Sequence, residues 1–175
     1  MLRFALILLI SVVAFSSCKK KEQTDDIIVE KVIEKPQEGP ESMGNDEQSG
    51  SITWIKGAEY SYTIKRVSDS ELPLVTNHEK EYRDNSITLV VRRADGSVFF
   101  EKTFSKANFA PVLPKDFKEN GVLLGMNFDK AEGNNLSFVV SVGSPDETNE
   151  EFYYVRMLLD NLGSTRAERI NELTN

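Results

Sequence analysis

The chain has 175 residues and carries 21 Lys and Arg against 28 Asp and Glu, which gives a formal net charge of −7. This acidic balance argues against nucleic acid as a partner, because phosphate groups are bound by basic patches. Cys18 is the only cysteine and His78 the only histidine. We therefore expect no disulfide, no cofactor and no metal site built on those residue types.

Residues 1–17 have the three parts of a secretory signal. Arg3 supplies a positive charge, residues 4–15 are apolar except for Ser11, and Ser16 and Ser17 precede Cys18. An apolar stretch this short falls below the roughly 20 residues that span a bilayer. We therefore expect cleavage before Cys18, with an uncleaved membrane helix as the alternative.

The ending Ser16-Ser17-Cys18 resembles the lipobox of bacterial lipoproteins, with Phe15 and Ser17 where that motif usually has Leu and Gly or Ala. The resemblance implies a diacylglycerol on the sulfur of Cys18 and an acyl chain on its new amino group. Two or more chains anchor a protein stably. We expect a protein held by lipid in the cell envelope, in the outer membrane, facing either the periplasm or the cell surface.

Residues 18–50 are predicted to be a flexible tether. They lack aromatic residues and are rich in charge, Gly and Pro, a composition that does not support a packed core. Residues 27–35 differ because they contain several β-branched apolar residues. We interpret them either as a strand that docks on a partner or as a transiently extended stretch. Residues 51–175 remain for one globular domain of common size.

Residues 87–104 give the clearest strand signal, because alternating apolar runs flank Asp95-Gly96. Asp-Gly favours a two-residue type I′ turn, in which both central residues have positive φ. This loop pairs Ala94 with Ser97, and so Val91 with Phe100. One face of the hairpin is then apolar and half-buried, and it carries Ile87, Leu89, Val91, Val98, Phe100 and Phe104.

The same alternation predicts further strands at residues 52–56, 59–67, 122–128, 136–142 and 152–159. Ile52 and Trp54 share one face, and Tyr60, Tyr62 and Ile64 share another. The third and fourth of these strands form a second long hairpin, whose predicted turn spans residues 129–135 and contains Gly and Asn suited to positive φ.

Two short helical turns are predicted, at residues 105–109 and 114–119, the second with Pro114 at its first position. Residues 165–168 fit a capping box that starts a helix, or a last strand after a turn at 160–163. The fold class is all-β with one or two short helical turns: an antiparallel meander that forms a β-sandwich or a partly open barrel.

Four stretches are similar to an uncharacterised lipoprotein domain family of Bacteroidetes-type bacteria, known as a domain of unknown function. They are Trp54 with residues 60–62, and residues 82–87, 93–100 and 104–109. The similarity covers most of residues 51–160. It implies an all-β envelope protein, and it brings no activity or catalytic residue.

Catalytic patterns are sparse in the chain. A Ser-His-Asp arrangement would need His78 with Asp69 or Asp84, and we interpret His78 as a solvated surface residue. Hydrolysis of glycosides needs two carboxylates about 5–10 Å apart, and no spacing singles out a pair among Glu79, Glu81, Asp84, Asp116, Asp129 and Asp146. Asp129, Glu132 and Asn134 share a loop that lacks the Asp ladder of a calcium site.

Aromatic side chains offer a better hypothesis for binding. Five tyrosines are candidates for a surface that stacks on sugars or meets a partner: Tyr60, Tyr62, Tyr82, Tyr153 and Tyr154. Tyr153 and Tyr154 are adjacent, so in a strand they point to opposite faces. We expect Trp54 to fill the core.

Three functions remain open. The leading hypothesis is a non-enzymatic lipoprotein whose β domain binds a protein or glycan partner in the envelope. The second is a structural or accessory subunit of an envelope assembly, which uses the faces of the domain or residues 27–33. The third is a hydrolase that uses carboxylates, which a cleft with two close carboxylates of shifted pKa would favour.

Overall fold

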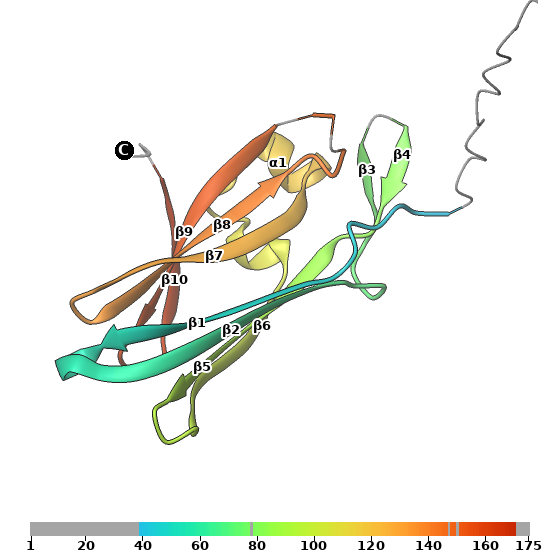
Figure 1. Ribbon diagram of the computed structural model, residues 1–175. Coiled ribbons are helices and arrows are strands. Elements are labelled where there is room, and N and C mark those ends of the chain that lie inside the picture. The colour runs from blue at the N-terminus through green and yellow to red at the C-terminus, as the bar shows by residue number, and fades with distance from the viewer. Residues whose placement is uncertain (1–38, 78, 147, 150, 171–175) are drawn as a thin grey trace, which may run out of the picture. The chain divides into compact units, whose positions relative to one another are not determined.

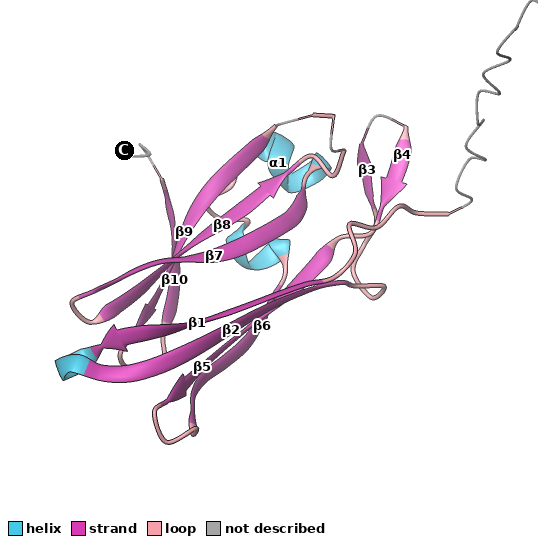
Figure 2. Cartoon of the chain, in the orientation of Figure 1, coloured by secondary structure: helices cyan, strands magenta, loops and turns pink. Residues whose placement is uncertain are grey.

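The computed structural model describes residues 39–170, except 78, 147 and 150 (Figure 1). The expected signal, Cys18 and residues 27–35 lie outside the described residues, as does His78. Strands dominate the described part (Figure 2). No helix in this part of the chain is long and apolar enough to cross a bilayer.

Two four-stranded antiparallel sheets form the body of the fold (Figure 1). The first has the order β1-β2-β5-β6, and the second has the order β10-β9-β8-β7. A separate hairpin, β3-β4, lies beside the entry of the chain. The strand bounds are β1 Asp46–Trp54, β2 Ala58–Ser68, β3 Val75–Asn77, β4 Lys80–Tyr82, β5 Asn85–Arg93, β6 Val98–Phe104, β7 Val122–Glu132, β8 Asn135–Gly143, β9 Phe152–Asp160 and β10 Thr165–Arg169.

The predicted all-β fold class is confirmed. Of the two predicted forms, a β-sandwich or a partly open barrel, the structure has the sandwich, because the sheets pack face to face and stay open. Along one side, β1 of the first sheet lies beside β7 of the second. Side chains join the two sheets along this side: Gln48 of β1 donates its amide to the carbonyl oxygen of Met126 at 2.6 Å, and Arg66 of β2 donates to that of Leu124.

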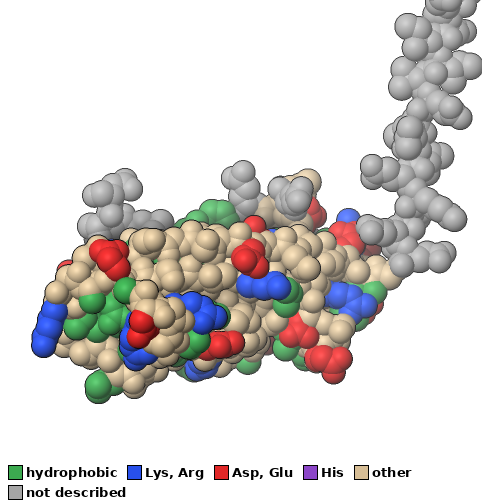
Figure 3. Space-filling model, turned by 60° about the horizontal axis from the view of Figure 1, so that its bottom comes forward, with side chains coloured by type: hydrophobic (Ala, Val, Ile, Leu, Met, Phe, Trp, Pro, Cys, Tyr) green, Lys and Arg blue, Asp and Glu red, His purple; other side chains and the backbone are tan. Residues whose placement is uncertain are grey.

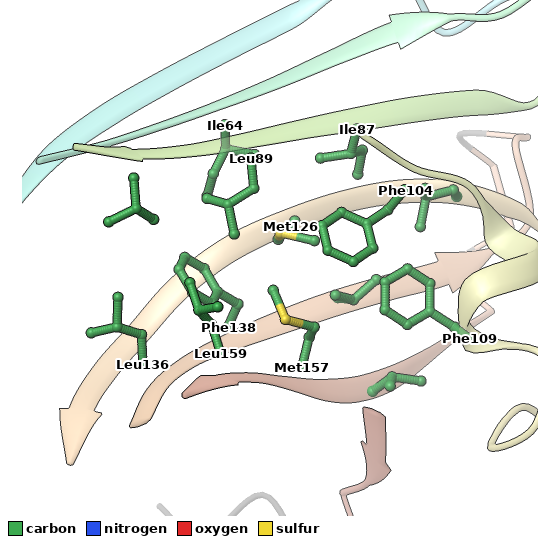
Figure 4. Packing of buried hydrophobic residues seen from close by; sticks show 14 of the residues in the cluster. Ile64, Ile87, Leu89, Phe104, Phe109, Met126, Leu136, Phe138, Met157 and Leu159 are labelled. Atoms are coloured by element: carbon green, nitrogen blue, oxygen red, sulfur yellow. The ribbon is translucent and has the colours of Figure 1, made fainter. Parts of the chain in front are cut away.

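The core fills the space between the sheets (Figure 4). Ile64, Ile87 and Leu89 project from the first sheet toward Met126, Phe138 and Met157 of the second. Alternation along each strand produces this layer. In β8, for example, every second residue is fully buried, namely Leu136, Phe138, Val140 and Val142.

The hairpin of β5 and β6 has the predicted Val91–Phe100 pair but a different turn. Arg93 donates its N–H to the carbonyl oxygen of Ser97 at 2.9 Å, so the loop has three residues, and Gly96 alone in it has positive φ (83°). The predicted two-residue type I′ turn is therefore wrong. A bulge at Phe99 then restores the predicted Val91–Phe100 pair, since the neighbouring residue Arg92 pairs with Val98.

This bulge reverses the predicted side of Val98 and turns Phe99 toward the core. Val98 is 43% exposed, whereas Phe99 packs against the core, with its ring 5.5 Å from that of Trp54. The prediction that Val98 faces the core was wrong, because the extra residue of a bulge shifts alternation by one position.

Both predicted aromatic faces of the first hairpin point to the same core. Ile52 of β1 pairs with Tyr60 of β2, and directly paired residues project from the same side of a sheet. The strand also starts earlier than expected. Residues 46–50, assigned to the tether by composition, form the first half of β1 and pair with β2.

The two helical turns are η2 Lys106–Phe109 and α1 Lys115–Asn120, and a further 3-10 turn, η1 Ile55–Gly57, joins β1 to β2. Near the C-terminus, where a helix or a last strand was predicted, the structure has a strand, because residues 165–169 pair with β9. The turn between β7 and β8 is shorter than predicted: only residues 133–134 separate the strands, which extend into the expected loop.

Candidate functional site

A pocket of about 360 Å³ lies where the loop between β2 and β3 meets η2 and α1. Leu72, Pro73 and Leu74 from that loop supply apolar surface, together with Ala107 and Ala110. Leu74 is 41% exposed. Pockets of this size and apolar character are the usual form of a ligand site, so it is the leading candidate.

Two charged residues, Asp84 and Lys106, also line the pocket. Asp84 precedes β5, and its carbonyl oxygen accepts the N–H of Asp69 at 3.0 Å, which draws the β2–β3 loop toward it. Lys106 opens η2. A capping box of Ser105 and Asn108 starts that turn, since Ser105 N–H donates to the Asn108 side chain at 2.8 Å.

Asp84 is almost fully buried and well satisfied. Its Oδ1 atom accepts the backbone N–H groups of Asn85 and Leu123, each at 2.8 Å. Its Oδ2 atom lies 3.8 Å from the Lys106 ammonium, and the two side chains are 7% and 15% exposed. Two backbone N–H groups and a cation therefore share this one carboxylate and fix the position of its side chain.

Lys106 is a half-buried cation. Burial lowers the pKa of its ammonium group, and the negative charge of Asp84 opposes that shift. Lys106 also donates to the carbonyl oxygen of Gly121. Because both charges have partners, the pair can orient a polar group of a ligand, but its geometry is that of a structural ion pair.

The formal charges around the pocket cancel. Lys106 and Lys118 are balanced by Asp84 and Glu119. On the face seen in Figure 3, basic and acidic side chains are likewise interspersed, with hydrophobic side chains in small groups. An uncharged, apolar group therefore suits this pocket better than an anion or a cation.

The five candidate tyrosines do not form one surface. Tyr60 packs on Trp54 and Tyr62 on Phe128, with ring centroids 5.3 Å apart in each pair. Tyr82 is buried against Val75 and Val122. Tyr153 packs 5.6 Å from Phe117, whereas Tyr154 lies 5.1 Å from Phe152.

Tyr153 and Tyr154 point to opposite faces of the second sheet. Tyr153 belongs to the set packed against the core, and Tyr154 sits beside Phe152, which is 48% exposed. Trp54 is 4% exposed and donates its indole N–H to the carbonyl oxygen of Gly133 at 3.2 Å. It therefore fills the core, as expected.

Of the candidate carboxylates, only Asp84 lines the apolar pocket. Asp129 accepts the Ser137 hydroxyl at 2.9 Å, and Glu132 pairs with Lys130 at 2.9 Å. Glu79, Glu81 and Asp116 are exposed. Within the described residues, no group of three or more His, Cys, Asp or Glu side chains is placed to hold a metal ion.

Sequence reasoning missed Lys106 and the 72–74 loop. Lys106 lies in the stretch 104–109 that carries the family resemblance, but nothing in its neighbours separates it from a surface lysine. Leu72-Pro73-Leu74-Val75 is an apolar run between the polar residues Glu71 and Thr76, and that run was the one available signal.

The model of a family described as "Domain of unknown function (DUF4738)" matches residues 25–166 of the chain. A search of curated proteins with the sequence of this chain found no match.

Proposed function

The chain belongs to this family, whose description assigns no activity, and we propose that it is a membrane-anchored extracytoplasmic lipoprotein with a non-catalytic domain that binds a protein partner. The apolar pocket beside Asp84 and Lys106 is the single observation that carries the binding role. The order Arg3, apolar run, Ser16-Ser17-Cys18 supports the lipid anchor.

A protein partner is favoured over a glycan by the chemistry of the pocket. Leucine, proline, valine and alanine line it, and no aromatic ring from the described part of the chain does. Sugars are usually bound by stacking on aromatic faces, while an apolar side chain of a protein is matched by aliphatic walls. Leu74, exposed at this site, is a natural contact for such a side chain.

A hydrolase is less well supported. Both oxygens of Asp84 already have partners within the fold. This carboxylate is therefore engaged in holding Asn85, Leu123 and Lys106 in place, and neither oxygen is left for a substrate. The pair therefore positions the loops around the pocket.

The anchor is tested by replacing the cysteine. We expect Cys18→Ser to move the protein from the membrane fraction to the soluble fraction of the envelope. Ser17→Ala is the matched control, because Ala is a usual residue before the lipidated cysteine, and it should leave the protein with the membrane. Equal membrane association of wild type and Cys18→Ser would rule out the anchor.

The pocket is tested by photo-crosslinking in intact cells. A crosslinking amino acid at position 74 should capture one envelope protein, identified by mass spectrometry. The same amino acid at Leu162, which is 85% exposed and outside the pocket, is the control. Capture from position 74 should disappear when Ala107→Trp fills the pocket. Identical adducts from both positions, or capture that survives the filling, would count against the binding role.

A further inference from the structure

A second pocket, of about 230 Å³, lies on the outer face of the sheet formed by β7, β8, β9 and β10. Registers place Lys130 beside Ser137, Ser137 beside Leu158, and Leu158 beside Arg166, in one row across the four strands. Arg156 lies in the next row, between Val139 and Glu168. This pocket shares no lining residue with the apolar one.

Positive charge exceeds negative charge around this second pocket. Its lining contains three cations, Lys130, Arg156 and Arg166, and two carboxylates, Glu132 and Glu168. Each carboxylate is held by its neighbour on the same strand: Glu132 by Lys130 at 2.9 Å and Glu168 by Arg166 at 2.8 Å. One cation in excess, on a chain of net charge −7, favours an anion at this place.

Arg156 is the third cation of the pocket. It makes no ion pair with a described residue, although its charge, after that of Lys130, helps to lower the pKa of Glu132. Its Nε atom is buried and has no hydrogen-bond partner among the described residues. No carboxylate of the described chain lies within 4.0 Å of its guanidinium group. The Asp129 carboxylate accepts the hydroxyl of Ser137, a lining residue, but does not itself line the pocket. The Nη groups of Arg156 are not among the buried atoms, and they make no hydrogen bond within the described part of the chain either, so they can donate to a ligand in the pocket.

We propose that the guanidinium group of Arg156 in this pocket binds the anionic group of a ligand, a carboxylate or a phosphate. A guanidinium group presents parallel N–H donors that match two oxygens of either anion. Leu158, half-buried in the same pocket, faces the remainder of the ligand with apolar surface. The pocket is smaller than those that enclose whole drug-sized ligands, so it holds one group of a larger molecule.

The test is a titration of the ¹⁵N-labelled protein, followed by NMR. The probes are sodium glucuronate, a carboxylate on a sugar, and inorganic phosphate; glucose is the uncharged control. We expect the Arg156 Nε–H signal and the amide signals of Ser137 and Val139 to shift saturably with an anion. Saturation by glucuronate alone assigns a carboxylate ligand, by phosphate alone a phosphate ligand, and by both an anion site of either kind. Added NaCl should weaken the binding.

Three variants complete the test. Arg156→Gln should weaken anion binding by about tenfold or more, because it removes a charge-assisted hydrogen bond. Arg156→Lys keeps the charge without the paired donors and should be intermediate. Arg92→Gln, on the exposed part of β5, should change affinity by less than about twofold. The proposal fails if neither anion gives a saturable shift, if glucose shifts the same signals equally, or if Arg156→Gln and Arg156→Lys both bind as wild type does.

Discussion

The carboxylate of Asp84 accepts the backbone N–H of Leu123 at 2.8 Å, and this bond joins the residue before β5 in the first sheet to β7 in the second. Asn85, the next residue, makes a parallel link by donating its side-chain amide to the carbonyl oxygen of Leu123 at 2.9 Å. Two polar side chains thus connect the sheets at the end where the apolar pocket opens, in addition to the apolar core.

Asp84→Ala should therefore be strongly destabilising. The substitution leaves Lys106 half-buried without its carboxylate, and removing one partner of a buried ion pair costs about 3–5 kcal/mol. Urea unfolding measures the change. Asp69→Ala is the control, because among the described residues the Asp69 carboxylate accepts only the exposed N–H of Glu71, and its loss should cost about 1 kcal/mol or less. Equal losses in the two variants would contradict the role given to Asp84.

The free energy of unfolding at alkaline pH should depend on the half-buried ammonium group of Lys106. Burial lowers the pKa of Lys106 in the folded protein below its ordinary value of 10.5. Between the folded and unfolded values, the unfolded chain binds the proton that the folded chain has released, so the free energy of unfolding gains a contribution that rises with pH. This contribution is complete above 10.5 and is lost as the pH falls through the folded pKa. Urea unfolding of wild type minus Lys106→Met, measured from neutral to alkaline pH, should rise across that window; a flat or falling difference would contradict it.

Gly143 should not tolerate a side chain. A Cβ atom there would meet the carbonyl oxygen of Glu151 and lie 2.8 Å from Cα of Phe152, so the backbone of β9 would have to move. Overpacking of this kind costs about 1–3 kcal/mol. Gly125→Ala is the matched control, since its Cβ meets only the Ser141 hydroxyl, at 3.6 Å. Thermal or urea unfolding that ranks the two variants equally would argue against close approach at Gly143.

Phe99→Ala should be more harmful than Val98→Ala. The Phe99 ring lies 5.5 Å from that of Trp54 and 5.9 Å from that of Tyr60, and two such aromatic pairs account for about 1–3 kcal/mol. Val98 is exposed, so its truncation should change stability by about 0.5 kcal/mol or less. The reverse order would mean that the bulge in β6 does not form.

Strand positions were largely predictable from the sequence, because alternation reports burial on one face. The Val91–Phe100 pair followed from Asp95-Gly96. The bulge could not be predicted from Asp95-Gly96, because the same dipeptide closes loops of two and of three residues. Only the backbone φ of Asp95 distinguishes the two kinds of loop. Residues 46–50 and 165–169 are polar strands at sheet edges, where hydrogen bonding, without burial, determines the structure.

The candidate sites were less predictable, because each depends on distant residues. Asp84 was one of six candidate carboxylates, and only the tertiary fold sets it beside Lys106. Arg156 alternates with buried neighbours in β9, which marks it as outward-facing. Its lack of a partner depends on how Glu132 and Glu168 pair on two other strands, and no pattern along the chain contains that information.

The way in which Glu41 attaches to β4 determines how mechanical tension on the N-terminal side of the chain would reach the domain. Glu41 pairs with β4: its N–H donates to Glu81 and its carbonyl oxygen accepts from Arg83, both at 2.8 Å. Tension between the N-terminal side of the chain and a partner held at Leu74 would cross these two bonds and the β3-β4 hairpin (Figure 1). The Glu41 carboxylate also pairs with Lys80 of β4 at 3.1 Å. These contacts precede β1 along the chain, so tension applied from the N-terminal side would load them before it loaded the strands of the two large sheets.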